Sequence, residues 1–371
     1  MTDHDRLAHE LAEELRNVEP GSPGLADGAA GLAVAFDRFD ERWPGEGYGA
    51  HAQALLRAAA AEVIHRPGGI GLYSGATGVA WAIAHLRGRP AADVVAVGDR
   101  ITALVLQRVQ DAPWTGPYDL VGGLVGVGVL ALERIDEEVG RAMLEATIDR
   151  LGELAVPGEG ISWLTPVAHL PETLRARAPQ GLVNTGVAHG VAGVVALLGA
   201  ATGAGVGRAG LLLADAVRWL LAQEVDGRMP TQVISGTPSF GRDAGWCYGD
   251  PGLAVALLGA ARGAGHADWE SLAVRRARAC GALERAWIVD ASLCHGSAGM
   301  AHALTRIAAA TGDDAVGTTA AVWRDRIEEQ RPVGAGVLEG TAGVALALLA
   351  GSEPSGAGWD RFLMVSAPGE S

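Results

Sequence analysis

Three side chains of types that bind zinc stand at matching positions along this chain. Cys247 and Cys294 each precede a glycine by two residues, and His295 directly follows Cys294. Two thiols and one imidazole give three ligands for a tetrahedral ion and leave a fourth position for water or substrate, which is typical of a catalytic zinc site. A free cysteine taken alone is more often a core residue, and we interpret Cys280 in that way. The equivalent placement of the other two favours a metal site.

A histidine and an aspartate offer proton chemistry near the same kind of glycine step. His189 precedes a glycine by one residue, as His295 does, which makes it a candidate proton donor. The alternative is a histidine whose hydrogen bonds are satisfied within the core. Asp119 lies four residues before Gly123, where it could orient a histidine or cap the N-terminus of a helix.

Two residues around Cys247 are further candidates. Arg242 could stabilise a negatively charged intermediate, or it could only pair with the adjacent Asp243. Tyr248 could hydrogen-bond reacting atoms, or it could pack beside the metal ligands. Neither residue has a spacing as specific as that of the three candidate ligands.

A G-x-x-G step recurs along the chain and must position all of these residues. Its first glycines are Gly28, Gly75, Gly123, Gly190, Gly249, Gly296 and Gly340. Periods of 44 to 67 residues indicate mostly stacked supersecondary units. Glycine at these turns is expected to supply a positive φ and to let neighbouring backbones approach closely.

Two kinds of helix alternate between the glycine steps. Amphipathic segments with the helical period are found near residues 7–15, 51–65, 91–110, 137–155, 213–221, 267–288 and 314–330. The segment after each step is apolar on all sides and is therefore expected to be buried. Seven half-exposed outer helices and seven buried inner helices predict an all-α fold, an (α/α)7 toroid, as a single domain over residues 1–371. The inner helices would begin at one end, where their dipoles favour thiolates and enolates.

Composition excludes several other classes. The net charge of −14, from 43 acidic and 29 basic residues, argues against nucleic acid or an anionic membrane as a partner. The first 20 residues lack a secretory signal, and the uncharged stretch 181–207 is interpreted as a core helix rather than a membrane span. Three cysteines fit a reducing, cytoplasmic location. The irregular tracts 156–181 and 227–245 are expected at the mouth of the barrel.

The chain resembles a known family at its most specific motifs. The strings Trp246-Cys-Tyr-Gly-Asp-Pro-Gly252, Leu293-Cys-His-Gly296 and Asn184-x-Gly-x-Ala-His-Gly190 are similar to those of lanthionine synthetase C proteins, the lanthipeptide cyclases. The resemblance implies one Zn²⁺ held by Cys247, Cys294 and His295. It also implies His189 as the main acid–base residue, with Asp119, Arg242 and Tyr248 around it.

The resemblance also implies an activity and partners. The activity is intramolecular addition of cysteine thiols to dehydroalanine or dehydrobutyrine in a precursor peptide, which forms thioether rings. The partners are the dehydrated precursor, with its leader and core, and a separate dehydratase. Some family members carry an extra small domain, for which the intervals here leave little room. A free-standing cyclase is expected, since no dehydratase or kinase segment is seen before the first repeat.

Other functions remain open from the residues alone. An α/α-barrel prenyltransferase could also activate thiols with zinc, whereas a terpene cyclase is disfavoured because no Asp-x-Asp-Asp string occurs. Zinc with an open position could instead activate water in a hydrolase. A third alternative is a non-catalytic, peptide-binding partner of another modifying enzyme.

Overall fold

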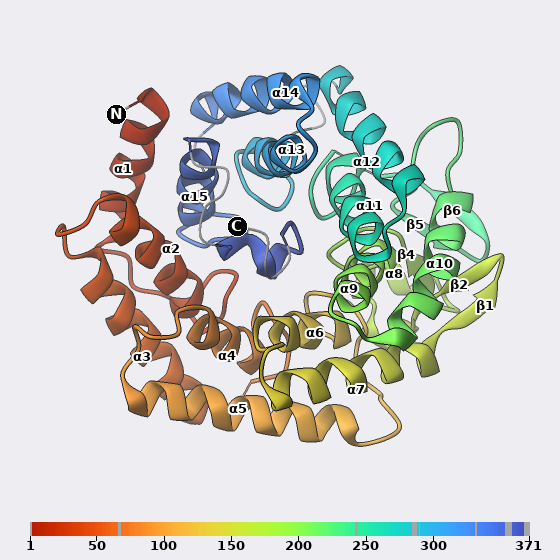
Figure 1. Ribbon diagram of the computed structural model, residues 1–371, viewed down its shortest axis with the longest axis horizontal. Coiled ribbons are helices and arrows are strands. Elements are labelled where there is room, and N and C mark those ends of the chain that lie inside the picture. The colour runs from red at the N-terminus through yellow and green to blue at the C-terminus, as the bar shows by residue number, and fades with distance from the viewer. Residues whose placement is uncertain are drawn as a thin grey trace.

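The helices of this protein form two concentric rings. The computed structural model describes residues 2–65, 68–241, 244–283, 288, 290–330, 332–352 and 358–366. Figure 1 shows one ring of helices around the centre and a second ring outside it. This arrangement confirms the predicted toroid.

The inner helices each follow one of the glycine steps and are almost entirely buried. They are α2 (Ala29–Arg42), α4 (Ala76–His85), α6 (Leu124–Glu133), α9 (Val191–Gly203), α11 (Asp250–Ala264), α13 (Ser297–Thr311) and α15 (Thr341–Ser352). In α2, every residue from Ala29 to Phe39 is buried. Such helices need neighbours on all sides, and burial of each large apolar side chain contributes about 1.5–3 kcal/mol.

The outer helices bury one face and expose the other. They are α1 (Asp3–Leu15), α3 (Tyr48–His65), α5 (Ala92–Gln110), α7 (Glu138–Leu154), α10 (Gly207–Ala222), α12 (Ala267–Ala279) and α14 (Asp314–Asp325). The helices expected to reach residues 288 and 330 are shorter. Helix α12 ends at Ala279 and is followed by the 3₁₀ turn η2 (Cys280–Ala282), and α14 is followed by η4 (Arg326–Glu329).

The ring closes between the two ends of the helical sequence. Each inner helix packs against the next, and α15 packs against α2. The N-terminal helix α1 packs on α15 and supplies its outer partner. Closure gives every inner helix two inner neighbours, so that none has an unpaired apolar side.

The glycines of the repeat serve close packing more than unusual backbone angles. A Cβ atom on the second glycine of each step would lie 1.8–2.5 Å from the carbonyl oxygen six residues earlier. The expectation of a positive φ at the first glycine is wrong for most steps, since Gly28, Gly75, Gly123, Gly190 and Gly296 have φ between −108° and −141°. Gly249 is the exception, with φ 126°.

The two irregular tracts form small sheets beside α10. Strands β1 (Val156–Gly158) and β2 (Gly160–Ser162) make a hairpin. Strands β3 (Leu164–Thr165), β4 (Leu182–Asn184), β5 (Gln232–Ile234) and β6 (Thr237–Ser239) make an antiparallel sheet in that order. The turn η1 (Val167–His169) and the short helix α8 (Glu172–Arg175) connect β3 to β4. The sequence analysis did not predict this pairing between tracts about 50 residues apart.

The last described residues fold back into the middle of the ring. The 3₁₀ helix η5 (Trp359–Leu363) lies near the centre in Figure 1. It is in contact with α2 and α6 on the inner ring. No helix in the described part of the chain combines the length and the apolar character needed to cross a membrane.

Candidate metal centre

The loops that precede the seven inner helices are hydrogen-bonded to one another around one end of the toroid. We number them from one to seven in chain order. In each loop the residue two places before the first glycine, or the residue beside it, takes part in these bonds. The backbone links are Leu25 N to Tyr73 O, Tyr73 N to Val121 O, Val187 N to Cys247 O, Cys247 N to Cys294 O, Cys294 N to Leu338 O and Val337 N to Ala26 O, at 2.7–3.3 Å.

This ring of loops brings the two candidate cysteine ligands together. They occupy the same position in the fifth and sixth loops, and the Cys247 amide donates directly to the Cys294 carbonyl over 3.0 Å. The ligand atoms of Cys247, Cys294 and His295 lie within 4.8 Å of one another. Cys294 is buried, and Cys247 and His295 are partly exposed. The three side chains therefore form a possible metal site that remains partly accessible to solvent.

Asp290 orients the histidine of this site and was missed by the sequence analysis. Its Oδ2 lies 2.9 Å from His295 Nε2, and its Oδ1 accepts a hydrogen bond from the Ser292 amide over 2.8 Å. With Nε2 held in this way, Nδ1 is the ring nitrogen that can bind a metal. A carboxylate on the second nitrogen is the usual companion of a metal-bound histidine. The sequence signal that could have identified Asp290 is an acidic residue five positions before the candidate ligand His295.

The pKa of each of these side chains depends on the charges and hydrogen bonds of the others. A hydrogen bond from Cys294 lowers the pKa of Cys247, and the contact with His295 adds to this effect, although burial opposes it. The same hydrogen bond raises the pKa of Cys294, so that one thiol ionises well before the other. The hydrogen bond to Asp290 raises the pKa of His295 to about 10. Burial raises the pKa of Asp290, but the contact with His295 outweighs it and holds this pKa at about 2.

His189 and Asp119 form a pair at the junction between the third and fourth loops. His189 Nδ1 lies 2.7 Å from Asp119 Oδ2, and the histidine side chain is 44% exposed. Burial lowers the pKa of His189, but the hydrogen bond and the negative charge of Asp119 outweigh it and raise this pKa. Asp119 Oδ1 also accepts from the Gly122 amide over 2.8 Å. The aspartate therefore orients the histidine and also braces the turn before α6.

This junction differs from the other six. The six backbone links of the ring have no counterpart between the described residues of the third and fourth loops. Side chains connect them instead, because the Tyr118 hydroxyl donates to the His189 carbonyl over 3.3 Å and the His189–Asp119 pair lies beside it. The fourth loop is linked to the fifth through Val187, whose amide donates to the Cys247 carbonyl over 3.0 Å.

Tyr248 is positioned from the small sheet. Asn184, the last residue of β4, donates from Nδ2 to the Tyr248 hydroxyl over 2.8 Å. Burial raises the pKa of Tyr248, so the phenol stays protonated and can act as a donor. Gly186 lies against the Tyr248 ring and leaves no room there for a side chain. The sheet therefore has a direct link to the site.

Two further residues singled out from the sequence remain. Arg242 and its neighbour Asp243 lie outside the described residues. Cys280 is fully buried at the end of α12, where η2 begins, and its thiol donates to the Arg276 carbonyl. Burial raises the pKa of this thiol, as expected for a packing residue.

This chain is similar to known proteins over nearly its whole length. The sequence profile of lanthionine synthetase C-like proteins matches residues 19–364. A solved structure described as nisin cyclase is similar, with a TM-score of 0.82 and 19% sequence identity over 98% of this chain and 96% of that chain. At this identity the likeness shows a shared fold. No curated protein sequence matches the chain. Because the family profile spans nearly its whole length, the chain belongs to the lanthionine synthetase C-like family.

Proposed function

We propose that this protein is a zinc-dependent lanthipeptide cyclase. It closes thioether rings by intramolecular addition of cysteine thiols to dehydroalanine or dehydrobutyrine in a precursor peptide. The observation that carries the proposal is the convergence of the Cys247, Cys294 and His295 ligand atoms within 4.8 Å, on the same ring of loops as the His189–Asp119 pair. The structural likeness to a protein described as nisin cyclase supports it.

The donor set suits zinc. Two sulfurs and one nitrogen are typical ligands of a tetrahedral Zn²⁺ that keeps one open position. The hydrogen bond of His295 to Asp290 supplies the outer support that such ligands require. Zinc bound here would lower the pKa of a peptide thiol while leaving the sulfur nucleophilic.

The addition requires one proton acceptor and one proton donor. The peptide thiol loses its proton, and the sulfur forms a bond to the β-carbon of the dehydro residue. The electron pair of the carbon–carbon double bond moves to the adjacent carbonyl as an enolate, and the α-carbon then takes a proton. The product has the same mass as the reactant because one proton leaves and one is added.

His189 is the residue that we assign to protonation of the α-carbon. Its Nδ1 is held by Asp119 at 2.7 Å, so Nε2 is the nitrogen that can exchange a proton with the substrate. The raised pKa of His189 keeps a larger share of the ring in the cationic, proton-donating form. The half-buried Tyr248 hydroxyl and the N-termini of the inner helices, each with about half a unit of positive charge, favour the enolate. Arg242 remains a candidate for the same task.

The chemistry defines the partners. We infer that the substrate is a dehydrated precursor with leader and core segments, and that a separate dehydratase makes its unsaturated residues. Both would meet this protein in the cytoplasm. The net charge of −14 is unfavourable for nucleic acid.

A peptide assay separates this function from its alternatives. The purified protein is incubated with a dehydrated, cysteine-containing peptide, and remaining thiols are then blocked with an alkylating reagent before mass spectrometry. Cyclisation removes the thiol at constant peptide mass. A hydrolase would change the mass of the peptide, and a non-catalytic partner would bind it but leave the thiol free to be alkylated. Either of these results would contradict the proposal.

A further inference from the structure

The last described segment of the chain occupies the inside of the toroid. We define the C-terminal plug as residues Gly358–Ser366. Four residues of η5, Trp359, Asp360, Phe362 and Leu363, are at most 2% exposed. Met364, which follows η5, has a left-handed backbone with φ 56°, a conformation that is unfavourable for a residue with a side chain. Surrounding contacts must therefore hold the segment firmly.

Ionic contacts anchor the C-terminal plug to opposite sides of the ring. Asp360, which is fully buried, accepts from His302 over 2.7 Å and from Arg306 over 2.6 and 3.0 Å, both on α13. On the other side, Arg361 Nη1 lies 3.2 Å from Glu133 on α6. Each buried carboxylate has more than one partner, since Glu133 also lies 3.0 Å from His85 on α4. The position of the plug across the ring is therefore fixed.

Two consecutive carbonyl groups of the plug accept hydrogen bonds from aromatic side chains of the second and fifth loops. The Phe362 carbonyl accepts from the Tyr73 hydroxyl over 2.9 Å. The Leu363 carbonyl accepts from Trp246 Nε1 over 3.0 Å. The Tyr73 and Trp246 rings contact each other edge to face, with centroids 6.4 Å apart. Trp246 directly precedes Cys247, and Tyr73 holds the equivalent position to Cys247 in the second loop.

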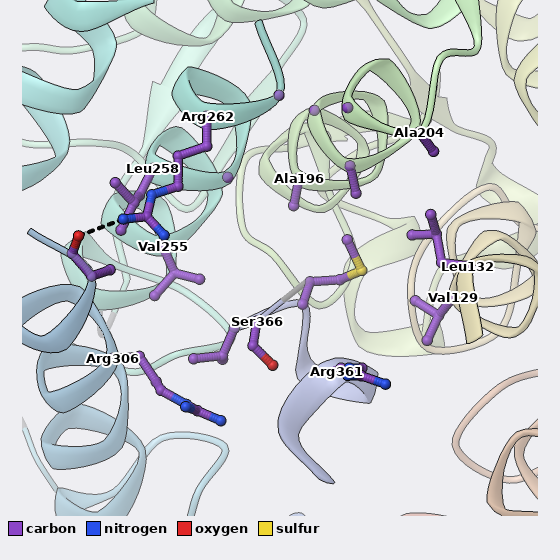
Figure 2. Close-up of a pocket in the computed structure, with 18 of the residues that line it drawn as sticks. Val129, Leu132, Ala196, Ala204, Val255, Leu258, Arg262, Arg306, Arg361 and Ser366 are labelled. Carbon is purple, nitrogen blue, oxygen red and sulfur yellow. Dashed lines mark hydrogen bonds between the residues drawn. The ribbon is translucent and has the colours of Figure 1, made fainter. Parts of the chain in front are cut away.

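The opposite side of the plug borders a cavity. This cavity has a volume of about 970 Å³ and is lined by the C-terminal halves of α6, α9, α11 and α13 together with Arg361 and Met364–Ser366. Figure 2 shows Arg361 and Ser366 inside the ring, between Leu132 on α6 and Arg306 on α13. The candidate metal ligands precede the N-terminal ends of two of these helices, α11 and α13. The plug thus lies between this cavity and the ring of loops. Its carbonyl groups support the Tyr73–Trp246 pair.

We propose that the C-terminal plug is a positioning element of the metal centre. Its carbonyl groups fix Tyr73 and Trp246, and Trp246 in turn fixes the backbone of Cys247 at the distance from Cys294 that a metal needs. This proposal rests on the proposed function only in taking the three ligands as a metal site. A purely space-filling plug would need the rings of the two aromatic residues but not their hydrogen bonds.

Matched tryptophan substitutions distinguish positioning from filling. Trp246→Phe removes the N–H donor and keeps an aromatic ring. Trp323→Phe is the control, since Trp323 is equally buried. It donates to the Cys280 carbonyl over 3.3 Å and makes no hydrogen bond to the plug. Cobalt(II) is the probe, because thiolate ligation gives it visible absorption. Trp246→Phe is expected to weaken cobalt binding about tenfold or more with unchanged far-UV circular dichroism, whereas Trp323→Phe leaves the affinity unchanged.

Further outcomes keep the test decisive. Equal cobalt affinity of Trp246→Phe and the unmodified protein would overturn the positioning role. If Trp246→Phe does not fold, Tyr73→Phe tests the neighbouring hydrogen bond in the same way. If the unmodified protein binds no cobalt, the proposed function fails, and the plug is tested separately by the rate of iodoacetamide alkylation of Cys247. That rate should be several-fold faster in Trp246→Phe than in Trp323→Phe, and equal rates would reject the inference.

Discussion

At the scale of single residues, the metal centre depends on side chains that touch its ligands as well as on the ligands themselves. Asp290 holds one nitrogen of His295 and is itself held by the Ser292 amide. Asp119 holds one nitrogen of His189 and braces the turn before α6. In both pairs a carboxylate holds one imidazole nitrogen and leaves the other for the role that we propose. The two histidines can therefore take different roles, one as a ligand and one as a proton donor.

Asp290→Asn should weaken the affinity for zinc. The substitution keeps the size of the side chain but removes the negative charge that orients His295, and loss of such outer contacts typically costs 10- to 100-fold in affinity. We expect the dissociation constant, measured by competition with a chromogenic chelator, to rise about tenfold or more. Asp215→Asn, which removes an exposed carboxylate paired with Arg218 on α10, is the control and should not change it. Unchanged affinity in Asp290→Asn would show that Asp290 is dispensable.

Asp119→Asn should shift the pH dependence of cyclisation. Because Asp119 raises the pKa of His189, the cationic proton donor persists to higher pH in the unmodified protein, and activity is lost as pH rises through that pKa. Without the carboxylate charge the pKa falls, so the alkaline limb of the pH–rate profile should move to lower pH. The zinc content should stay the same. An alkaline limb at the same pH as in the unmodified protein would mean that His189 is not the titrating donor.

At the scale of elements, each inner helix is joined to its loop by a glycine that allows backbone contact. A Cβ atom at Gly299 would lie 1.9 Å from the Leu293 carbonyl oxygen, and Leu293 directly precedes Cys294. The start of α13 and the loop that carries two candidate metal ligands therefore form one packed unit. The same contact recurs in all seven repeats, which explains why the glycine step, rather than a particular side chain, is the repeated feature.

Gly299→Ala should destabilise both the fold and the site. The added methyl group collides with backbone atoms that cannot rotate away, so we expect a loss of about 2 kcal/mol or more in the free energy of unfolding, measured by urea denaturation, together with weaker zinc binding. Gly259→Ala is the matched control, since it lies within α11 and a Cβ atom there meets nothing within 4 Å. It should stabilise the protein by about 0.5–1 kcal/mol. Equal effects of the two substitutions would contradict this account.

At the scale of the whole molecule, the closed ring rather than the metal holds the fold. Every inner helix packs between two others, and α1 completes the ring on α15. The candidate ligands lie on loops at one end, outside this helical core. The protein therefore differs from small zinc domains, in which binding of the metal supplies the folding free energy.

Removal of zinc should lower stability without unfolding the toroid. A ligand at 100 times its dissociation constant stabilises the folded state by about 2.7 kcal/mol. Chelation is thus expected to lower the melting temperature while the far-UV circular dichroism at 25 °C is retained, and added zinc should restore the melting temperature. Loss of helical signal on chelation would show that the metal is needed for folding. An unchanged melting temperature would indicate that no tight site exists.

The sequence by itself determined the toroid and the equivalent positions of Cys247 and Cys294, because both follow from local patterns that repeat. Helical periodicity and glycine spacing are properties of neighbouring residues, so the inner and outer helices could be predicted from the chain. The equivalence of Cys247 and Cys294 likewise follows from counting back from a glycine. The prediction of a positive φ failed at most steps, whereas the predicted close approach of backbones is seen at the second glycine of every step.

Only the tertiary structure decided which distant residues meet. Asp119 and His189 are 70 residues apart, the sheet joins tracts from two different intervals, and the C-terminal plug reaches Trp246 across 117 residues. The first two contacts depend on the packing of adjacent repeats, and the third depends on the ring that surrounds the plug. Non-local contacts of this kind leave no period in the sequence, and they become visible only when the helices have closed around their common centre.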